Sequence, residues 1–445
     1  MRAVFLYLTP LLALAGAQAP PEDRPLTIEE AVRIALQRHP DVEKARAAAE
    51  ALKGKIREVR AQALPDVAIH VNATRWRDPS LLNASGIEKF PEELRNALVP
   101  QGVNLFDYNV TLKQPLYTAG KVGTALRLAS IEAEGSAVDI DRAAQDLALN
   151  VVRACYDLLW AERYLTLVEE TQRQRRAHLD MARTRYQNGV ATEVDVLRSE
   201  VAVANGEPDL VRARNAIRQA RALLNFYLVR PIDFPTRLAA SLEDAPPWEQ
   251  WDLELLAAEA FRRRPELVRL RIAERSAETQ LELARAESRM RADFTGSYGV
   301  MARLPENLVN SQFVRWIVGV NFTLPVFDGF RRSGLVWQAT AARRAARLER
   351  EKVEQQVRLT LQQALDDLKA ARETVEAARA NVRQAERVLQ MTQENYQYGA
   401  ATTLDVVDAQ TALTVARTNL LRGLHDYSVA RANLLWAIGR RPEEK

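Results

Sequence analysis

Side chains that could catalyse a reaction or bind a metal ion are few and scattered in this chain of 445 residues. It has one cysteine, Cys155, and four histidines that share no metal-ligand spacing. It has no Ser-His-Asp order, glycine-rich phosphate loop or C-x-x-C motif. We therefore expect no catalytic residue, no metal site and no cofactor, and we predict that Cys155 is a buried structural thiol. The histidines are His39, His70, His178 and His425.

Charge is balanced along the sequence. The chain has 62 Lys and Arg residues against 58 Asp and Glu residues, which leaves a net charge of +4. Arginine and glutamate alternate through most helical stretches, as in Arg343-Arg344 followed by Glu349 and Glu351. A nucleic-acid-binding protein would concentrate positive charge on one face, so these charges indicate solvated helix faces and no nucleic-acid partner.

A turn motif with polar side chains occurs twice. Tyr186–Val196 recurs 210 residues later as Tyr396–Val406, with the common pattern Tyr-x-x-Gly-x-x-Thr-x-x-Asp-Val. Gly189 and Gly399 suit the left-handed residue that ends a helix. The motif therefore predicts a tight turn between two helices near residue 189 and again near residue 399.

The threonine and aspartate of each motif have a structural interpretation. Thr192 and Thr402 are each followed three residues later by an aspartate, Asp195 or Asp405, as in a helix capping box. Capping could be the whole role of these two aspartates, and a functional role is the alternative. Capping does not explain Asp408, which is therefore the better candidate for a functional acidic residue.

The duplication extends well beyond these turns. Pro115–Tyr117 recurs as Pro325–Phe327 at the same offset of 210, and His39–Asp41 resembles Arg264–Glu266 at an offset of 225. Each copy is predicted to contain a helix, a strand, a loop, a strand, a very long helix, a turn and a helix. The predicted organisation is a signal peptide at 1–17, a first repeat at 18–230, a proline-rich linker at 231–250, a second repeat at 251–438 and a C-terminal tail at 439–445.

The N-terminus is typical of an exported protein. Met1-Arg2 precedes the apolar run Ala3–Leu14 and the small residues Ala15-Gly16-Ala17, a pattern that predicts cleavage after Ala17. No later apolar segment has the length and lack of charge that a membrane-spanning helix needs.

The long helices must be positioned by neighbouring helices. Lys121–Gln187 and Arg331–Gln397 each contain 67 residues without proline, which would span about 100 Å as α-helix. Heptad spacing of apolar residues predicts that they pack side by side. A shorter helix is expected before each sheet segment, at about Thr27–Ala63 and Leu253–Arg289. The predicted seam comprises Leu361, Leu368, Val375, Val382 and Leu389 beside Ala364, Ala371, Ala378 and Ala385, and Val151, Leu158, Leu165 and Leu179 in the first copy.

Four strands are predicted, at about 67–76, 104–116, 292–302 and 313–325. Side chains alternate clearly in the second and fourth, so that Tyr108 and Val110 share one face while Asn109 and Thr111 share the other, and they alternate less cleanly in the first and third. Such segments suit tilted membrane strands, but an ordinary half-buried sheet alternates in the same way. Four strands cannot close a barrel, and open edges cannot lie in lipid. Several copies would therefore have to close around a pore, with eight strands from two chains or twelve from three.

The chain resembles TolC-like outer-membrane efflux proteins over nearly its whole mature length. The resemblance rests on Gln114–Lys121, its partner Leu324–Arg331 and the two Tyr-x-x-Gly-x-x-Thr-x-x-Asp-Val turns. It implies a mainly α-helical homotrimer with a twelve-stranded membrane β-barrel in the outer membrane. Below the barrel, a long α-helical barrel would cross the periplasm to a closed tip. Cargo would pass from an inner-membrane transporter and a periplasmic adaptor protein to the exterior.

The resemblance also implies site residues at the tip. Asp405 and Asp408 match aspartates that line its narrowest point, where copies would form an acidic ring that favours cations. Tyr396 and Asp195 resemble residues that tie inner and outer helix pairs together in the closed state. Ala401 stands where a related protein has an arginine, so we expect a closed tip held by different or fewer contacts.

Two further sets of turn residues are expected to matter. The tip turns are candidates for docking the adaptor, and the turns that join barrel to helix would position the strands. The tip set is Tyr186, Gly189, Thr192, Gly399 and Thr402, and the barrel-to-helix set is Pro115, Gly120, Pro325 and Gly329.

A periplasmic coiled-coil structural or adaptor protein without a membrane pore is the alternative. It would share the signal peptide and the heptads, but it would not need four strands with a lipid-facing aromatic set. Extraction separates the two functions, since a membrane channel requires detergent. The resemblance covers ducts for drug efflux, metal efflux and protein export, and it does not select one cargo.

Overall fold

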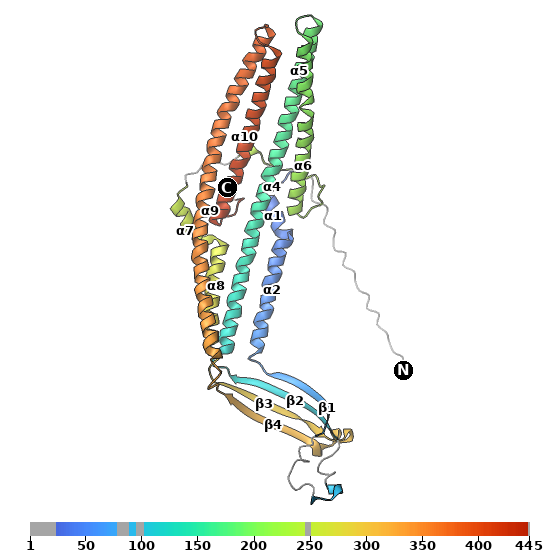
Figure 1. Cartoon of the computed structure of the whole chain (residues 1–445), viewed down its shortest axis with the longest axis vertical. Helices are drawn as coiled ribbons and strands as arrows, with labels where there is room; N and C mark the ends of the chain where they lie inside the picture. The colour runs from blue at the N-terminus through green and yellow to red at the C-terminus, as the bar shows by residue number, and fades with distance from the viewer. Residues whose placement is uncertain (1–23, 78–88, 95–101, 245–250, 444–445) are drawn as a thin grey trace, which may run out of the picture.

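The computed structural model describes residues 24–77, 89–94, 102–244 and 251–443. The predicted signal peptide at 1–17 lies outside the described residues, as do residues 245–250 of the predicted linker. The molecule is long and narrow, with helices side by side over most of its length and a sheet at one end (Figure 1).

The elements follow the same order in the two halves of the chain. The first half contains α1 (Ile28–Arg38), α2 (Pro40–Ala61), β1 (Asp66–Trp76), β2 (Val103–Tyr117), α4 (Lys121–Gln187), α5 (Glu193–Ala204) and α6 (Glu207–Tyr227). The second half contains α7 (Leu253–Arg263), α8 (Pro265–Ala286), β3 (Arg291–Ala302), β4 (Val314–Thr323), α9 (Arg331–Gln397) and α10 (Thr403–Ile438). Short 3₁₀ helices are η3 (Leu242–Asp244), η4 (Pro305–Val309) and η5 (Ser311–Phe313).

The first helix of each half is broken, whereas the sequence analysis expected one continuous helix. The breaks fall at His39 and Arg264, where the backbone is extended with ψ of 132° and 121°. Each of these residues precedes a proline, Pro40 or Pro265, which disfavours the helical conformation at the residue before it. The proline then starts the next helix, where its missing N–H has no helical partner to lose.

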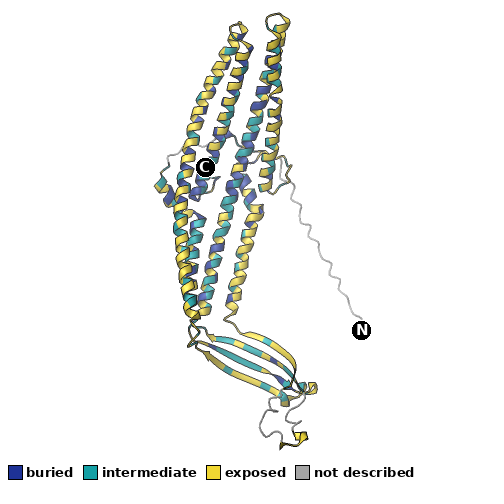
Figure 2. Cartoon of the chain, viewed as in Figure 1, coloured by how far each residue is buried: buried dark blue, intermediate teal, exposed yellow. Residues whose placement is uncertain are grey.

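The two long helices have the predicted bounds, and most of their predicted seam is buried, whereas Leu165, Ala371 and Ala385 are half-buried. Leu361 and Leu368 are 0% and 1% exposed, and Val375 and Leu389 are each 7% exposed. One heptad beyond Leu389, Tyr396 is also buried, at 5% exposure. The seam therefore extends to the far end of α9, where the buried side of the helix is narrow and most of its surface is exposed (Figure 2).

The helices form a row whose members change halfway along the molecule. In the half next to the sheet, α2 packs on α4, α4 on α8 and α8 on α9. In the other half, α5 and α6 pack on α4, α4 on α10 and α10 on α9. The long helices α4 and α9 thus run the whole length, and α9 lies at one end of the row in both halves.

The largest apolar clusters lie where the two halves of the row meet. One cluster joins α9 and α10 to α7, and the other joins α1, α4 and α6. Residues of the predicted linker take part, because Leu242 is fully buried and Leu238 forms a parallel β-bridge with Leu26. Cys155 is fully buried in the second cluster, and this desolvation raises the pKa of its thiol well above the ordinary value.

The four strands form one antiparallel sheet in the order β1-β2-β3-β4. The middle pairing, β2 with β3, joins the two halves of the chain. The strands lead directly into the helices, so the row α2-α4-α8-α9 continues the order of the strands (Figure 1).

Candidate functional site

One face of the sheet is apolar across all four strands. Ile69 lies opposite Val110, Val110 opposite Tyr298, and Tyr298 opposite Trp316. Directly opposite residues project to the same face, so these four side chains form a continuous apolar band. Their exposed fractions are 70%, 39%, 62% and 70%, in that order. A monomeric soluble protein rarely leaves such a band uncovered, so this face indicates contact with lipid or another protein.

The opposite face of the sheet is polar. Asn109 shares it with Asp107 and Thr111, and the three side chains are linked by hydrogen bonds of 2.8 and 2.9 Å. On the neighbouring strands, the Asn321 amide donates to the Thr295 hydroxyl over 3.2 Å. The two faces therefore suit two environments, one apolar and one aqueous.

The outer edges of the sheet are unpaired within the part of the chain that the structure describes. The strand order leaves β1 and β4 at the two edges, with main-chain groups that have no strand beside them. In an apolar environment those groups would need partners, so the sheet requires further strands to close it.

The junctions between strand and long helix each contain two left-handed residues in succession. Ala119 and Gly120 have φ of 52° and 83°, and Gly329 and Phe330 have φ of 64° and 66°. Each junction has one glycine, but at a different position of the pair. Pro115 lies beside an irregularity in the β2–β3 register. The predicted turn residues Gly120 and Gly329 lie in these junctions, whereas Ala119 and Phe330 were not named because their side chains give no sequence signal for left-handed backbone.

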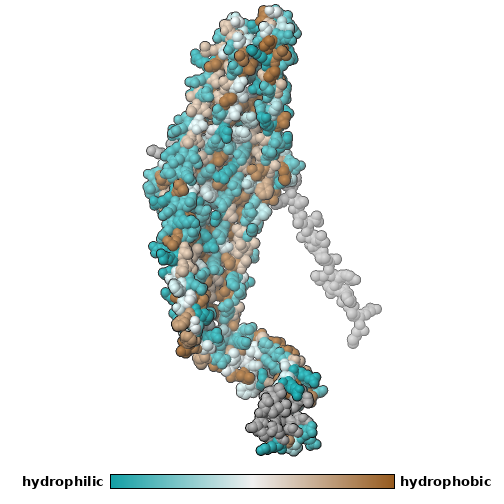
Figure 3. Space-filling model, viewed as in Figure 1, coloured by the Kyte–Doolittle hydropathy of each residue, from teal (hydrophilic) through white to brown (hydrophobic). Residues whose placement is uncertain are grey.

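Large apolar side chains surround the second junction. Beside the predicted turn residue Pro325, Val326 and Phe327 are 88% and 78% exposed, and Phe330 is 76% exposed. Hydrophobic residues are also visible on the sheet and near the far ends of the helices (Figure 3).

The two helical tips are built alike, at the end of the molecule remote from the sheet (Figure 1). Gly189 and Gly399 have φ of 72° and 76°, the left-handed region that the motif predicts. At each tip, the threonine hydroxyl accepts from the aspartate N–H and the carboxylate accepts from the threonine N–H, which is a complete capping box. The box pairs are Thr192 with Asp195 and Thr402 with Asp405.

The capping boxes stabilise the charged form of both aspartates. Hydrogen bonds from the Thr192 side chain and backbone lower the pKa of Asp195, and Thr402 lowers the pKa of Asp405 in the same way. A hydrogen bond with Thr403 also contributes at Asp195, so this residue contacts the start of α10 as well. Asp408 lies one turn into α10 and is exposed.

Tyr396 is the centre of the contact between the two tips. Its hydroxyl accepts from Thr403 over 3.3 Å, and its ring lies 5.4 Å from the His178 ring of α4. Arg185, in the last turn of α4, donates to the Tyr396 carbonyl over 2.7 Å and places its guanidinium carbon 4.5 Å from the ring centroid. Burial lowers the pKa of His178, which favours the neutral imidazole.

The sequence analysis missed Arg185 and His178. Arg185 directly precedes the turn motif, and cations favour the last turn of a helix, which was an available signal. Nothing in the local sequence indicates that Arg185 faces the other hairpin. The docking candidates lie at the tip surface, where Tyr186 is 46% exposed and Val190 is 64% exposed.

Residues that could bind a metal do not gather anywhere in the described ranges, where no group of three His, Cys, Asp or Glu side chains has suitable geometry. Among the described helices, none combines the length and the apolar character that crossing a membrane would take.

Comparison with known proteins identifies relatives along almost the whole chain. The family model for outer membrane efflux proteins matches residues 31–228 and 256–440. Outer membrane protein TolC of Escherichia coli (strain K12) is 23% identical over 426 residues, which cover 91% of this chain and 80% of TolC. Alkaline protease secretion protein AprF of Pseudomonas aeruginosa is 24% identical over 397 residues, which cover 85% of this chain and 77% of AprF.

Solved structures show the same fold. The open state of the Neisseria gonorrhoeae MtrE outer membrane channel aligns with a TM-score of 0.77 at 19% identity, over 98% of each chain. The family match itself includes both long helices and all four strands. The chain therefore belongs to the outer membrane efflux protein family and is a TolC-like exit duct of the outer membrane.

Proposed function

We propose that three copies of this chain close into one duct, with a twelve-stranded barrel in the outer membrane and an α-helical barrel in the periplasm. The observation that carries this proposal is the uncovered sheet with one apolar face, one polar face and two free edges. Rolled into a ring, it would turn the apolar face to lipid and the polar face to water, and the free edges would pair between copies.

The proposed number of copies, three, rests on the family resemblance and on the width of the barrel lumen. Two copies would give eight strands, whose interior side chains fill the lumen, whereas twelve strands leave a wider passage. The repeats at 18–230 and 251–438, joined by the linker at 231–250, would then supply two equivalent sectors per chain.

Cargo would enter at the tips and leave through the barrel. An inner-membrane transporter would supply the energy and a periplasmic adaptor would connect it to this duct, which itself conducts passively. One relative is named as a protease secretion protein, so protein is among the cargoes that such a duct would pass.

The tips are the proposed gate. Asp405 and Asp408 would line its narrowest point, and Tyr396 with Asp195 would hold the hairpins together. Arg185 supplies the cation that Ala401 lacks, which supports a closed tip with different contacts.

The tip turns are the proposed docking site of the adaptor. A groove of about 400 Å³ lies between α5 and α10 just beyond the turns. Exposed Val194, Leu197 and Val201 line it on the α5 side, and Leu404 lines it on α10. An adaptor hairpin with apolar side chains at its end suits such a groove.

Substitution of the turn glycines tests the docking role. Gly189→Ala and Gly399→Ala place a side chain at positive φ, which costs on the order of 1–2 kcal/mol at each turn and should distort the docking surface. We expect loss of efflux in cells with normal amounts of protein in the outer membrane. Gly123→Ala is the control, because this glycine of α4 has open space around it and no positive φ. Unchanged efflux in both tip variants would exclude the docking role.

Mass and conductance test the function as a whole. The purified protein should require detergent, run as three chains by light scattering, and form low-conductance pores in planar bilayers. A monomer that is soluble without detergent would support the periplasmic coiled-coil adaptor instead.

A further inference from the structure

The contact between the two halves of the chain has a counterpart at the free ends of the row. Helix α4 of the first half packs on α8 of the second half. The same two elements occur again at the free ends of the row, because α9 corresponds to α4 at an offset of 210 and α2 corresponds to α8 at an offset of 225. The corresponding helices have equal lengths, so every residue of the α4–α8 contact has a defined counterpart on α9 and α2.

Ion pairs mark the contact inside the chain. Arg275 of α8 pairs with Glu134 of α4 over 3.0 Å, and Arg269 of α8 pairs with Asp139 of α4 over 3.2 Å. A third pair joins Arg142 of α4 to Glu266 at the start of α8, over 3.7 Å.

The counterparts of these three pairs also have opposite charges. Shifting the residues by the two offsets gives Arg344 of α9 with Glu50 of α2, Glu349 with Lys44, and Lys352 with Asp41. Charge polarity is reversed in the first pair and kept in the other two, so complementarity has been maintained although the residues differ. Unrelated surface charges would be expected to produce like-charge contacts among three such pairs, and none occurs.

Two further contacts give compatible counterparts. Arg127 with Glu282, 3.1 Å apart, corresponds to Trp337 with Arg57, and a guanidinium on an indole face is a favourable cation–π pair. Lys121 with Glu287 corresponds to Arg331 with Gln62, which can hydrogen-bond.

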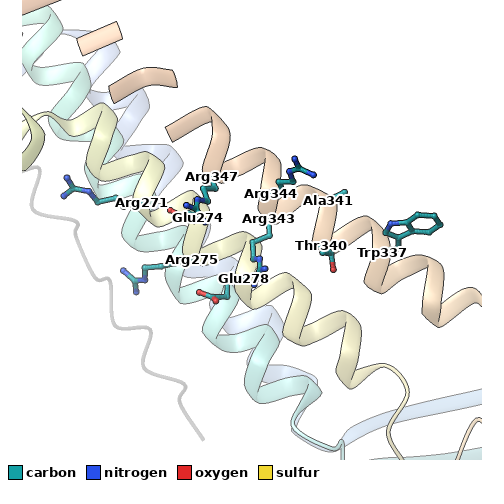
Figure 4. Close-up of a pocket in the computed structure, with 10 residues that line it drawn as sticks. All are labelled: Arg271, Glu274, Arg275, Glu278, Trp337, Thr340, Ala341, Arg343, Arg344 and Arg347. Carbon is teal, nitrogen blue, oxygen red and sulfur yellow. The ribbon is translucent and has the colours of Figure 1, made fainter. Parts of the chain in front are cut away.

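Two of the side chains concerned lie at the border of a cleft of about 760 Å³ between α8 and α9. Arg343 points toward α8 across this cleft, whereas Arg344 and Trp337 border the cleft and extend away from α8 (Figure 4). Within the described residues, Arg344, Glu50 and Lys44 take part in no ion pair and all three are exposed. Glu349 and Lys352 are bonded to each other, 3.3 Å apart along one helix, which leaves both at the surface.

The strands give the same result independently. In the β2–β3 pairing, Val110 lies opposite Tyr298 and Leu112 opposite Gly296. The counterparts are Val320 with Ala73 and Phe322 with Val71, all on the apolar face. A register wrong by one residue would place apolar side chains on the polar face, so this agreement excludes odd shifts of the register.

We propose that a second copy of this chain occupies the free edge of α9 and β4, in the register that α8 and β3 use against α4 and β2 inside the chain. The proposal rests on the proposed function, since it assumes that copies close into a ring, and it adds which residues meet. Arg344 then pairs with Glu50 of the partner subunit, and Val320 lies opposite the partner's Ala73.

Cross-linking tests the strand register. A chain with Val320→Cys and Ala73→Cys should form disulfide-linked oligomers in the membrane, because the two positions become directly opposite. The matched control combines Val320→Cys with Ile69→Cys, which is on the same face four residues away. The native Cys155 is buried and does not compete. Stronger cross-linking in the control would overturn the register.

Charge reversal tests the helix register. Arg344→Glu alone should lower the temperature at which the oligomer dissociates in detergent, and adding Glu50→Arg should restore it. Arg383→Glu is the control, because it makes the same charge change at an exposed position of α9 far from the sheet. Adding Glu50→Arg to Arg383→Glu should not raise the temperature at which the oligomer dissociates.

The results separate this inference from the proposed function. An oligomer without rescue, or with cross-links only in the control register, rejects the register and leaves the ring intact. A protein that stays monomeric in every variant rejects both. Rescue together with cross-linking at Val320 and Ala73 supports both.

Discussion

At the scale of single residues, one buried tyrosine connects the two tips. The Arg185 guanidinium both donates to the Tyr396 carbonyl and stacks on its ring, from the opposite hairpin. A charge-assisted hydrogen bond contributes about 1.5–3 kcal/mol and a cation–π contact at least about 0.5 kcal/mol. This contact joins the two hairpins near their tips, and it supplies a cation although Ala401 stands where a related protein has an arginine.

Removing this cation should open the tip. In Arg185→Ala, loss of roughly 2 kcal/mol would shift the closed–open equilibrium by about 30-fold toward the open state. We expect a higher single-channel conductance, or more time in an open level, in planar bilayers. Arg173→Ala is the control, since Arg173 is exposed on the same helix four turns before the tip. Equal conductance in both variants would show that Arg185 does not hold the gate.

A histidine joins α4 to α10 near the middle of the molecule. His425 lies 2.9 Å from Asp157 of α4 through Nε2 and 2.9 Å from Asp426 through Nδ1. Burial lowers the pKa of His425, but the hydrogen bonds to the two aspartates outweigh burial, so that the net shift is upward. The imidazolium therefore stabilises the folded chain when it is protonated.

The pH dependence follows from this upward shift. Stabilisation should be complete below the unfolded pKa of about 6.5 and should be lost as pH rises through the higher folded pKa. The unfolding temperature of the wild type should therefore exceed that of His425→Gln most at pH 6, and the difference should shrink toward pH 9. A difference that grows with pH would contradict the assigned ion pairs. His70→Gln, on an exposed strand position, is the control.

At the scale of elements, the pairing of the strands defines the apolar face more clearly than the alternation within any one strand. Each strand alternates, which fits a membrane strand or an ordinary half-buried sheet equally well. The register removes this ambiguity, because it aligns Ile69, Val110, Tyr298 and Trp316 in one band that no described helix covers.

Two adjacent residues of β4 provide a matched test. Val318 lies on the apolar face and Ile317 on the polar face, with exposed fractions of 60% and 53%. Val318→Lys should cost about 2–4 kcal/mol if that face meets lipid near the bilayer midplane, whereas Ile317→Lys should cost little in a water-filled lumen. We expect the first variant to be reduced in the outer-membrane fraction and the second to be normal. The opposite result would show that the lipid-facing and lumen-facing sides of the sheet are assigned wrongly.

Much of the element order was predictable because its signals are local. The bounds of α4 and α9 follow from glycines at both ends and from 67 residues without proline, and the tips follow from Thr-x-x-Asp boxes. The breaks at His39 and Arg264 could have been predicted from the prolines after them. The β2–β3 pairing, the Arg185–Tyr396 contact and the burial of Leu242 could not, since each depends on residues far apart in sequence.

At the scale of the whole molecule, strands and helices end in the same open arrangement. The row α2-α4-α8-α9 continues the sheet β1-β2-β3-β4. In both, the first and last members have no neighbour on their outer side within the described chain. A single copy therefore has complementary ends, and joining end to end is the arrangement that generates rings.

The duplicated tips have a consequence for stoichiometry. The proposed ring of three chains would present six hairpin ends of two alternating kinds, which share Gly-x-x-Thr-x-x-Asp but differ where Glu193 on one matches Thr403 on the other. A binding protein that contacts only the shared residues could occupy all six positions, whereas one that contacts Glu193 would occupy three. Counting bound partners per ring would thus reveal which side chains the partner contacts.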